Sequence, residues 1–79
     1  MSTVPEIREK VEEHLRLVID IAKEHSHRGL GFLDLIQEGI AGLTKAAESY
    51  DGPNKLFPFY ASMYIRKHIR MAIGVEGSR

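Results

Sequence analysis

The residues with the clearest potential for chemistry lie in the C-terminal third of the chain, where aromatic and basic side chains are interleaved. They are Phe59, Tyr60, Met63, Tyr64, Arg66, Lys67, His68 and Arg70. Aromatic rings beside Arg and Lys on one helix are suited to stacking on unpaired bases and to neutralising phosphates. The alternative is that Tyr60 and Tyr64 lie at the edge of a core and that the basic residues form a solvated face. Composition alone leaves both interpretations open.

A second group of polar residues follows a glycine-containing corner in the middle of the chain. The stretch from Arg28 to Gly39 leads into a helix with one apolar face, and its short polar run consists of Asp34, Gln37 and Glu38. Polar side chains displayed beside an apolar stripe are typical of a docking surface. We therefore predict that another macromolecule binds here.

The sequence offers little support for catalysis or metal binding. His25 and His27 stand one residue apart, without a cysteine, a third ligand or an HExxH run. We interpret them as exposed residues that cap the end of a helix. There is no nucleophile elbow, no phosphate-binding glycine loop and no close carboxylate pair away from surface helix positions. We predict that the protein is not an enzyme and has no metal or other cofactor.

Length and charge narrow the class of protein further. The 79 residues suffice for one small domain spanning residues 1–79, and there is no cysteine for disulfides. No apolar run approaches the roughly 20 residues of a membrane span, and the N-terminal residues lack a signal-peptide pattern, so we expect a cytoplasmic protein. The net charge is zero, yet residues 1–52 carry six Lys/Arg against ten Asp/Glu, and residues 53–79 carry five against one. This polarity suits a basic protein partner on one side and a polyanion on the other.

Apolar periodicity predicts the elements that position these groups, namely three main helices over about 4–25, 32–50 and 58–75 in a small all-α bundle. Thr3 and Glu6 have the spacing of a capping box at the start of the first helix. Gly29 or Gly31 is expected to supply a left-handed position after this helix. Gly39 and Gly42 interrupt the second helix, which predicts the close approach of another backbone.

Several segments together resemble region 2 of the bacterial RNA polymerase sigma factors of the sigma-70 family. The resemblance extends from about Leu15 to Ile73, and the Asp-Leu-Ile-Gln-Glu-Gly string at residues 34–39 is its most specific part. The matching segments are Leu17–Lys23, Arg28–Leu30, Phe32–Gly39, Gly42–Ala46, Phe57, Tyr60–Ser62, Ile65–Arg66 and Ile69.

The resemblance implies an all-helical domain with two macromolecular partners. Asp34, Gln37 and Glu38 would face the clamp coiled coil of the largest subunit of core RNA polymerase. The next helix would contact the non-template strand of the promoter −10 element, and an anti-sigma factor is a further partner that the resemblance admits. The DNA-binding residues that it implies are Phe57, Tyr60, Ser62, Met63, Tyr64, Arg66, Lys67 and Arg70.

The chain also departs from the family pattern, mainly in the segment assigned to DNA. Met63 and Tyr64 stand where housekeeping members have two tryptophans, and Pro58 and Phe59 stand where they have a Ser-Thr pair. Met63 offers less flat surface for a flipped base than a tryptophan does. The alternative function is therefore a sigma-like interaction module or regulator that docks on polymerase without melting DNA.

Overall fold

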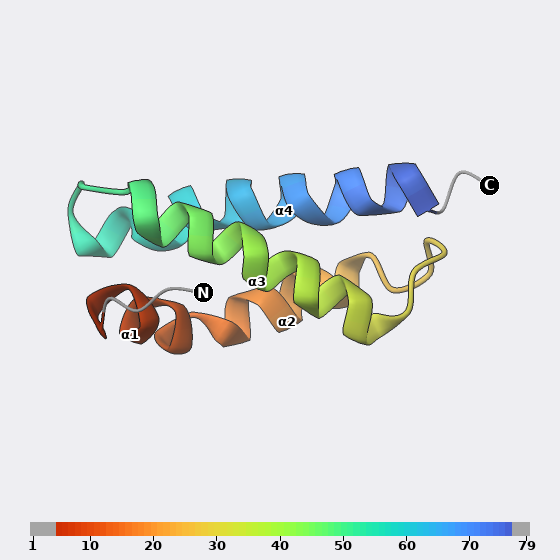
Figure 1. Cartoon of the computed structure of the whole chain (residues 1–79), viewed down its shortest axis with the longest axis horizontal. Coiled ribbons are helices and arrows are strands. Elements are labelled where there is room, and N and C mark those ends of the chain that lie inside the picture. The colour runs from red at the N-terminus through yellow and green to blue at the C-terminus, as the bar shows by residue number, and fades with distance from the viewer. Residues whose placement is uncertain (1–4, 77–79) are drawn as a thin grey trace.

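The structure, a computed structural model, describes residues 5–76. All secondary-structure elements in this range are helices (Figure 1). No strand occurs within this range, which confirms the predicted all-α class. The elements in chain order are α1 (Pro5–Glu13), α2 (Leu15–Glu24), α3 (Phe32–Ser49), the short 3₁₀ helix η1 (Asn54–Leu56) and α4 (Phe57–Glu76).

The prediction of one continuous first helix over about 4–25 is wrong, because the chain turns at His14. The His14 backbone amide bonds to the carbonyl of Val11, and the amide of Leu17 bonds to the carbonyl of His14, so the bonds on both sides span three residues instead of four. The His14 Nδ1–H donates to the carbonyl of Lys10 at 2.8 Å. The predicted capping box at Thr3 lies outside the described residues.

The corner between α2 and α3 has the glycine that was predicted for it. Gly29 has a φ of 106°, a conformation that L side chains rarely adopt. His25 at the end of α2 is not the exposed residue expected from sequence, since it is only 4% exposed and its Nδ1–H donates to the carbonyl of Ile21 at 2.9 Å. A histidine that satisfies its own backbone in this way can be buried at low cost.

Helix α3 is the central element and packs against α1, α2 and α4 (Figure 1). Two glycines on its inner face allow this packing: Gly42 meets the backbone of another helix, as predicted, whereas Gly39 meets side chains only. A Cβ on Gly39 would lie 2.6 Å from Val18 Cγ1, and a Cβ on Gly42 would lie 2.5 Å from the carbonyl oxygen of Tyr64. The α3 and α4 backbones therefore approach each other more closely than any larger residue would permit.

One apolar cluster lies between the helices and holds them together. Its buried members are Val18, Ile21, Ala22, Leu35, Leu43, Ala46, Ala47, Phe57, Ala61, Ile65 and Ile69. Burying each of the larger side chains stabilises the fold by about 1.5–3 kcal/mol relative to exposure. No helix within residues 5–76 is both long and apolar enough to cross a membrane.

Candidate functional site

The predicted docking residues share the outer surface of the first half of α3. Asp34 and Gln37 are exposed and Glu38 is half-buried. Together with Leu30 in the α2–α3 corner and Ala72 on α4, they line a shallow groove of about 290 Å³. The structure thus brings all three polar side chains to one surface, at the end of the molecule where α4 also ends (Figure 1).

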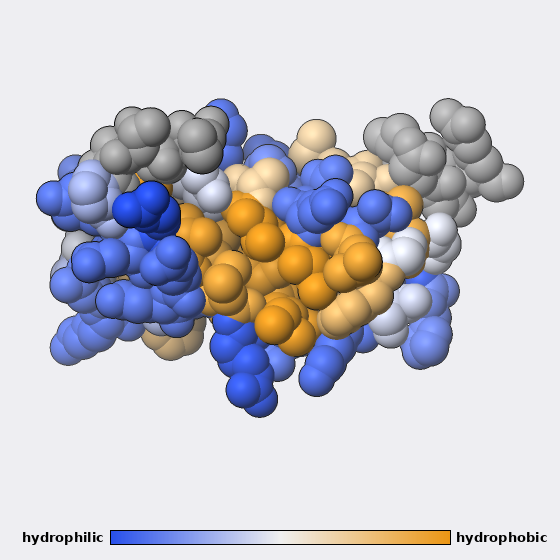
Figure 2. Space-filling model, turned by 60° about the horizontal axis from the view of Figure 1, so that its bottom comes forward, coloured by the Kyte–Doolittle hydropathy of each residue, from blue (hydrophilic) through white to orange (hydrophobic). Residues whose placement is uncertain are grey.

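Apolar side chains are exposed at the start of α3, next to this polar surface, and at the start of α2. Leu33 is 74% exposed, and Phe32 and Leu15 are also exposed. Figure 2 shows apolar atoms gathered over the face formed by α2 and α3 and surrounded by polar residues. An apolar area with a polar rim is characteristic of a protein interaction surface.

The predicted DNA-binding residues do not all lie on the same surface of α4. Phe57 is only 1% exposed and belongs to the core, so it presents no surface to a partner, and we omit it from the candidate site. Met63, Lys67 and Arg70 are exposed. Ser62 is half-buried, and its hydroxyl donates to the carbonyl of Phe59 at 2.8 Å.

Tyr60 and Tyr64 are half-buried and take part in a stack of aromatic rings. The Tyr60 ring centroid lies 4.8 Å from that of Tyr50 and 5.0 Å from that of Tyr64. The Tyr60 hydroxyl is hydrogen-bonded to the hydroxyls of Ser49 at 2.7 Å and Tyr64 at 3.1 Å. The alternative interpretation left open from sequence, that these rings lie at the edge of the core, therefore describes their packing.

The hydroxyls of the stack influence each other's ionisation. For Tyr60 the bond with Ser49 lowers the pKa, but the bond with Tyr64, together with burial, outweighs it and the pKa is raised. The bond with Tyr60 lowers the pKa of Tyr64.

Arg66 is engaged by a residue from another helix. Its guanidinium nitrogens lie 2.5 and 3.5 Å from the two carboxylate oxygens of Glu24 on α2. The hydrogen bond from Arg66 lowers the pKa of Glu24, although partial desolvation acts in the opposite direction. Periodicity could not have indicated this pair, because the two residues are 42 positions apart.

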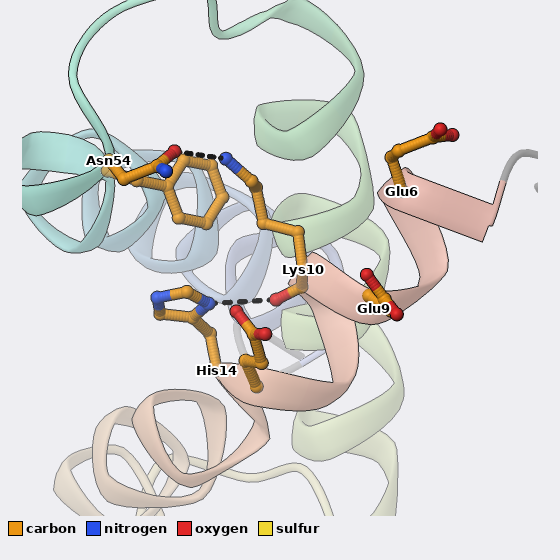
Figure 3. Close-up of a pocket in the computed structure, with 7 residues that line it drawn as sticks. Glu6, Glu9, Lys10, His14 and Asn54 are labelled. Carbon is orange, nitrogen blue, oxygen red and sulfur yellow. Dashed lines mark hydrogen bonds between the residues drawn. The ribbon is translucent and has the colours of Figure 1, made fainter.

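A larger groove, of about 390 Å³, lies between α1 and the start of α4 (Figure 3). The Lys10 ammonium bonds to Asn54 Oδ1 at 3.1 Å and lies 4.8 Å from the centre of the Phe57 ring. The His14 ring meets the same phenyl ring edge-on at 4.8 Å. These contacts hold α1 against the start of α4, and the carboxylates of Glu6, Glu9 and Glu13 also line the groove.

A metal centre is not evident in the described part of the chain. Within residues 5–76 no three or more His, Cys, Asp or Glu side chains are grouped so that they could hold an ion. The arrangement instead defines a helical binding module. Polar and exposed apolar residues share a surface of α3, and basic and exposed apolar residues share a surface of α4.

Comparisons with known proteins define the family to which this module belongs. The family described as Sigma-70 region 2 matches residues 11–77. The chain is similar to the RNA polymerase sigma factor SigA of Nostoc sp., with 50% identity over 64 residues, which is 80% of this chain and 16% of the relative. The same identity and coverage apply to RNA polymerase sigma factor SigA1 of Synechococcus elongatus. SigA of Microcystis aeruginosa is also 50% identical over 64 residues, 15% of its length.

The chain belongs to the sigma-70 family and contains its region 2. This confirms the resemblance noted in the sequence. The chain spans about one sixth of the length of these relatives, which extend well beyond the matched region.

Proposed function

We propose that the chain is the region 2 domain of a sigma factor, which acts in the cytoplasm. It binds the clamp coiled coil on the largest subunit of core RNA polymerase and contacts the promoter −10 element during initiation of transcription. The role is one of binding, without a chemical step. The observation that carries the proposal is the family match over residues 11–77, within which Asp34, Gln37 and Glu38 share one outer surface.

The polymerase contact is assigned to this polar surface and the apolar residues beside it. Carboxylates at the start of α3 are favoured by the positive end of the helix dipole and remain available to cationic side chains of a partner. An anti-sigma factor that covered the same surface would compete with polymerase for it.

The polymerase contact is tested by titrating the 79-residue chain against the isolated clamp coiled coil. Glu38→Lys is expected to weaken binding at least tenfold, because it replaces a hydrogen-bond acceptor with a positive charge that repels the cationic side chains of the partner. Gln37→Ala is expected to cost about 1 kcal/mol, the value of one hydrogen bond. Glu48→Lys makes the same charge change on an exposed position near the other end of α3 and should leave binding unaltered. Unchanged affinity in both the Gln37 and Glu38 variants would refute the assignment.

The DNA contact is assigned to α4. Met63, Tyr64 and Tyr60 supply apolar and aromatic surface, Ser62 a hydroxyl, and Arg66, Lys67 and Arg70 positive charge. Binding of a single-stranded −10 oligonucleotide should fall steeply as salt increases, because phosphate contacts release counterions. Absence of binding at low salt would count against this half of the proposal.

A second candidate function is a region 2 module that docks on polymerase without opening DNA. The observation that favours it is the internal engagement of Tyr60 and Tyr64, together with a methionine at position 63. The two functions differ in one measurement, because only the first predicts binding to single-stranded DNA.

A further inference from the structure

Arg66 differs from the other basic residues of α4 because a carboxylate from another helix already holds it. Its guanidinium donates to both carboxylate oxygens of Glu24, the last residue of α2, at 2.5 and 3.5 Å. Lys67 and Arg70, by contrast, are exposed on the same helix. An anion that approaches α4 from solvent therefore meets an Arg66 that is already engaged.

Glu24 stands at an unfavourable place in its own helix. At the last residue of α2, the negative end of the helix dipole disfavours a carboxylate. The compensation comes mainly from α4, because the hydrogen bond from Arg66 lowers the pKa of Glu24, and His25 and Arg70 add smaller effects in the same direction. Arg66 and Arg70 lie one turn apart on one side of α4. The position of Glu24 is thus explained by these arginines and not by the stability of α2.

A carboxylate and a phosphate compete for the same groups of an arginine. Each can accept two parallel N–H bonds from one guanidinium. While Arg66 donates to Glu24, these N–H groups cannot serve a phosphate, and the ionised carboxylate repels a phosphate placed beside it. The side chains of Arg66 and Glu24 are 35% and 53% exposed, so a partner in solvent can reach the pair.

We propose that Glu24 is an internal competitor of DNA, which holds Arg66 in the absence of DNA and must release it before Arg66 can contact a phosphate. The inference rests on the proposed function, since it concerns how the DNA contact of α4 is restrained. The affinity of the chain for single-stranded DNA is then lower than its basic residues alone would give. Glu24 acts through Arg66 and makes no contact with DNA itself.

The test compares the unaltered 79-residue chain with Glu24→Gln in binding to a single-stranded −10 oligonucleotide at low salt, followed by fluorescence anisotropy. Glu24→Gln removes the charge and keeps the shape of the side chain. Affinity is expected to rise about three- to fivefold, which corresponds to the loss of a partly exposed ion pair. The slope of log affinity against log salt should steepen by up to about one, because Glu24 no longer neutralises Arg66. A residue that served only the stability of the fold would give no such gain.

Asp20→Asn is the matched control for the change of charge. It also removes one carboxylate from α2, one turn earlier, but Asp20 is paired with Arg16 of the same helix at 3.4 Å. Because no cation of α4 is released, the DNA affinity of this variant should stay at that of the unaltered chain. Equal gains in Asp20→Asn and Glu24→Gln would reveal a general effect of net charge and would overturn the proposal.

A double-mutant cycle identifies the group that Glu24 restrains. In an Arg66→Ala background, Glu24→Gln should raise DNA affinity no more than Asp20→Asn does, since no guanidinium remains to be released. A full gain in this background would show that Glu24 acts on DNA binding by another route, and the proposal would be wrong. Circular dichroism at the assay temperature verifies that each variant is folded.

The outcomes separate this inference from the function on which it rests. If the unaltered chain binds DNA and Glu24→Gln binds no more tightly, the inference fails and the proposed function stands. If neither the unaltered chain nor Glu24→Gln binds single-stranded DNA at low salt, both the inference and the DNA half of the proposed function fail.

Discussion

Gly42 lies where α3 approaches the backbone of α4, and this contact sets the spacing of the two helices. A Cβ at position 42 would lie 2.5 Å from the Tyr64 carbonyl oxygen and 3.0 Å from the Ile65 Cα, neither of which can move as a flexible side chain can. We therefore predict that Gly42→Ala destabilises the fold by about 1–3 kcal/mol through overpacking. Urea unfolding followed by circular dichroism measures this change.

Gly74 is the matched position for this comparison, since it is also a glycine within a helix. A Cβ on Gly74 meets no atom within 4 Å, so Gly74→Ala should stabilise the fold by up to about 1 kcal/mol through helix propensity. Equal effects of the two substitutions would contradict the close contact at Gly42.

The Glu24–Arg66 pair predicts a dependence of stability on pH. Because the hydrogen bond from Arg66 lowers the pKa of Glu24 below its unfolded value of about 4.5, the pair stabilises the fold above that pH. The contribution is lost as the pH falls through the lower pKa of the folded state. The melting temperature of Glu24→Gln should therefore fall below that of the unaltered chain at pH 7, and the difference should shrink below pH 4.

The control is the Glu24→Gln substitution in a chain from which the Arg66 guanidinium has been removed. In an Arg66→Ala background, Glu24→Gln should have no comparable effect on the melting temperature at pH 7. Molar salt should also reduce the difference, since both side chains are partly exposed. A difference that persisted unchanged at pH 3 would show that the carboxylate charge is not responsible.

At the scale of elements, the turn at His14 between α1 and α2 packs against the start of α4. The His14 ring packs edge-on against Phe57 and its Nδ1–H bonds to the Lys10 carbonyl. His14→Ala should destabilise the fold by about 1 kcal/mol, the value of an aromatic pair. Thermal unfolding measures the effect, and Glu12→Ala, at an exposed position of α1, should change stability by less than about 0.5 kcal/mol.

The same turn shows which part of the fold could not be predicted from sequence. The apolar repeat through Val11, Leu15 and Val18 continues across His14 without interruption, so periodicity indicated one helix. The contacts that favour the turn come from Phe57, more than 40 residues away. Helices α3 and α4 agree with prediction to within one or two residues, because Gly31 precedes α3, Pro53 lies between the two helices and Pro58 lies in the first turn of α4.

The residues of the two candidate surfaces were predictable from sequence to different degrees. Asp34, Gln37 and Glu38 fall opposite a regular apolar stripe, so their shared surface followed from the helical period. Along α4 the apolar period through Phe57, Ala61, Ile65 and Ile69 marks the buried face, and Phe59 falls outside this period and is exposed. The family resemblance gave Phe57 a DNA role, yet it is the packing of α4 on α3 that buries this ring.

At the scale of the whole molecule, the zero net charge is the sum of two opposite halves. The acidic residues of the first 52 positions include those on the outer surface of α3, and the basic residues of the remainder include the outer side of α4. The polymerase and DNA surfaces proposed here therefore occupy different helices and have opposite charge. Partners of opposite charge can each be attracted by one surface and repelled by the other.

This separation predicts that the two binding activities can be removed independently. Lys67→Ala and Arg70→Ala should each reduce the slope of log affinity against log salt for single-stranded DNA by about one, since each removes one phosphate contact. Neither substitution should alter affinity for the clamp coiled coil. Conversely, Glu38→Lys should weaken clamp binding at least tenfold and leave the DNA salt slope unchanged, because Glu38 lies on α3 beside Asp34 and Gln37. Loss of both activities in either variant, with helicity preserved by circular dichroism, would show that one shared surface serves both partners.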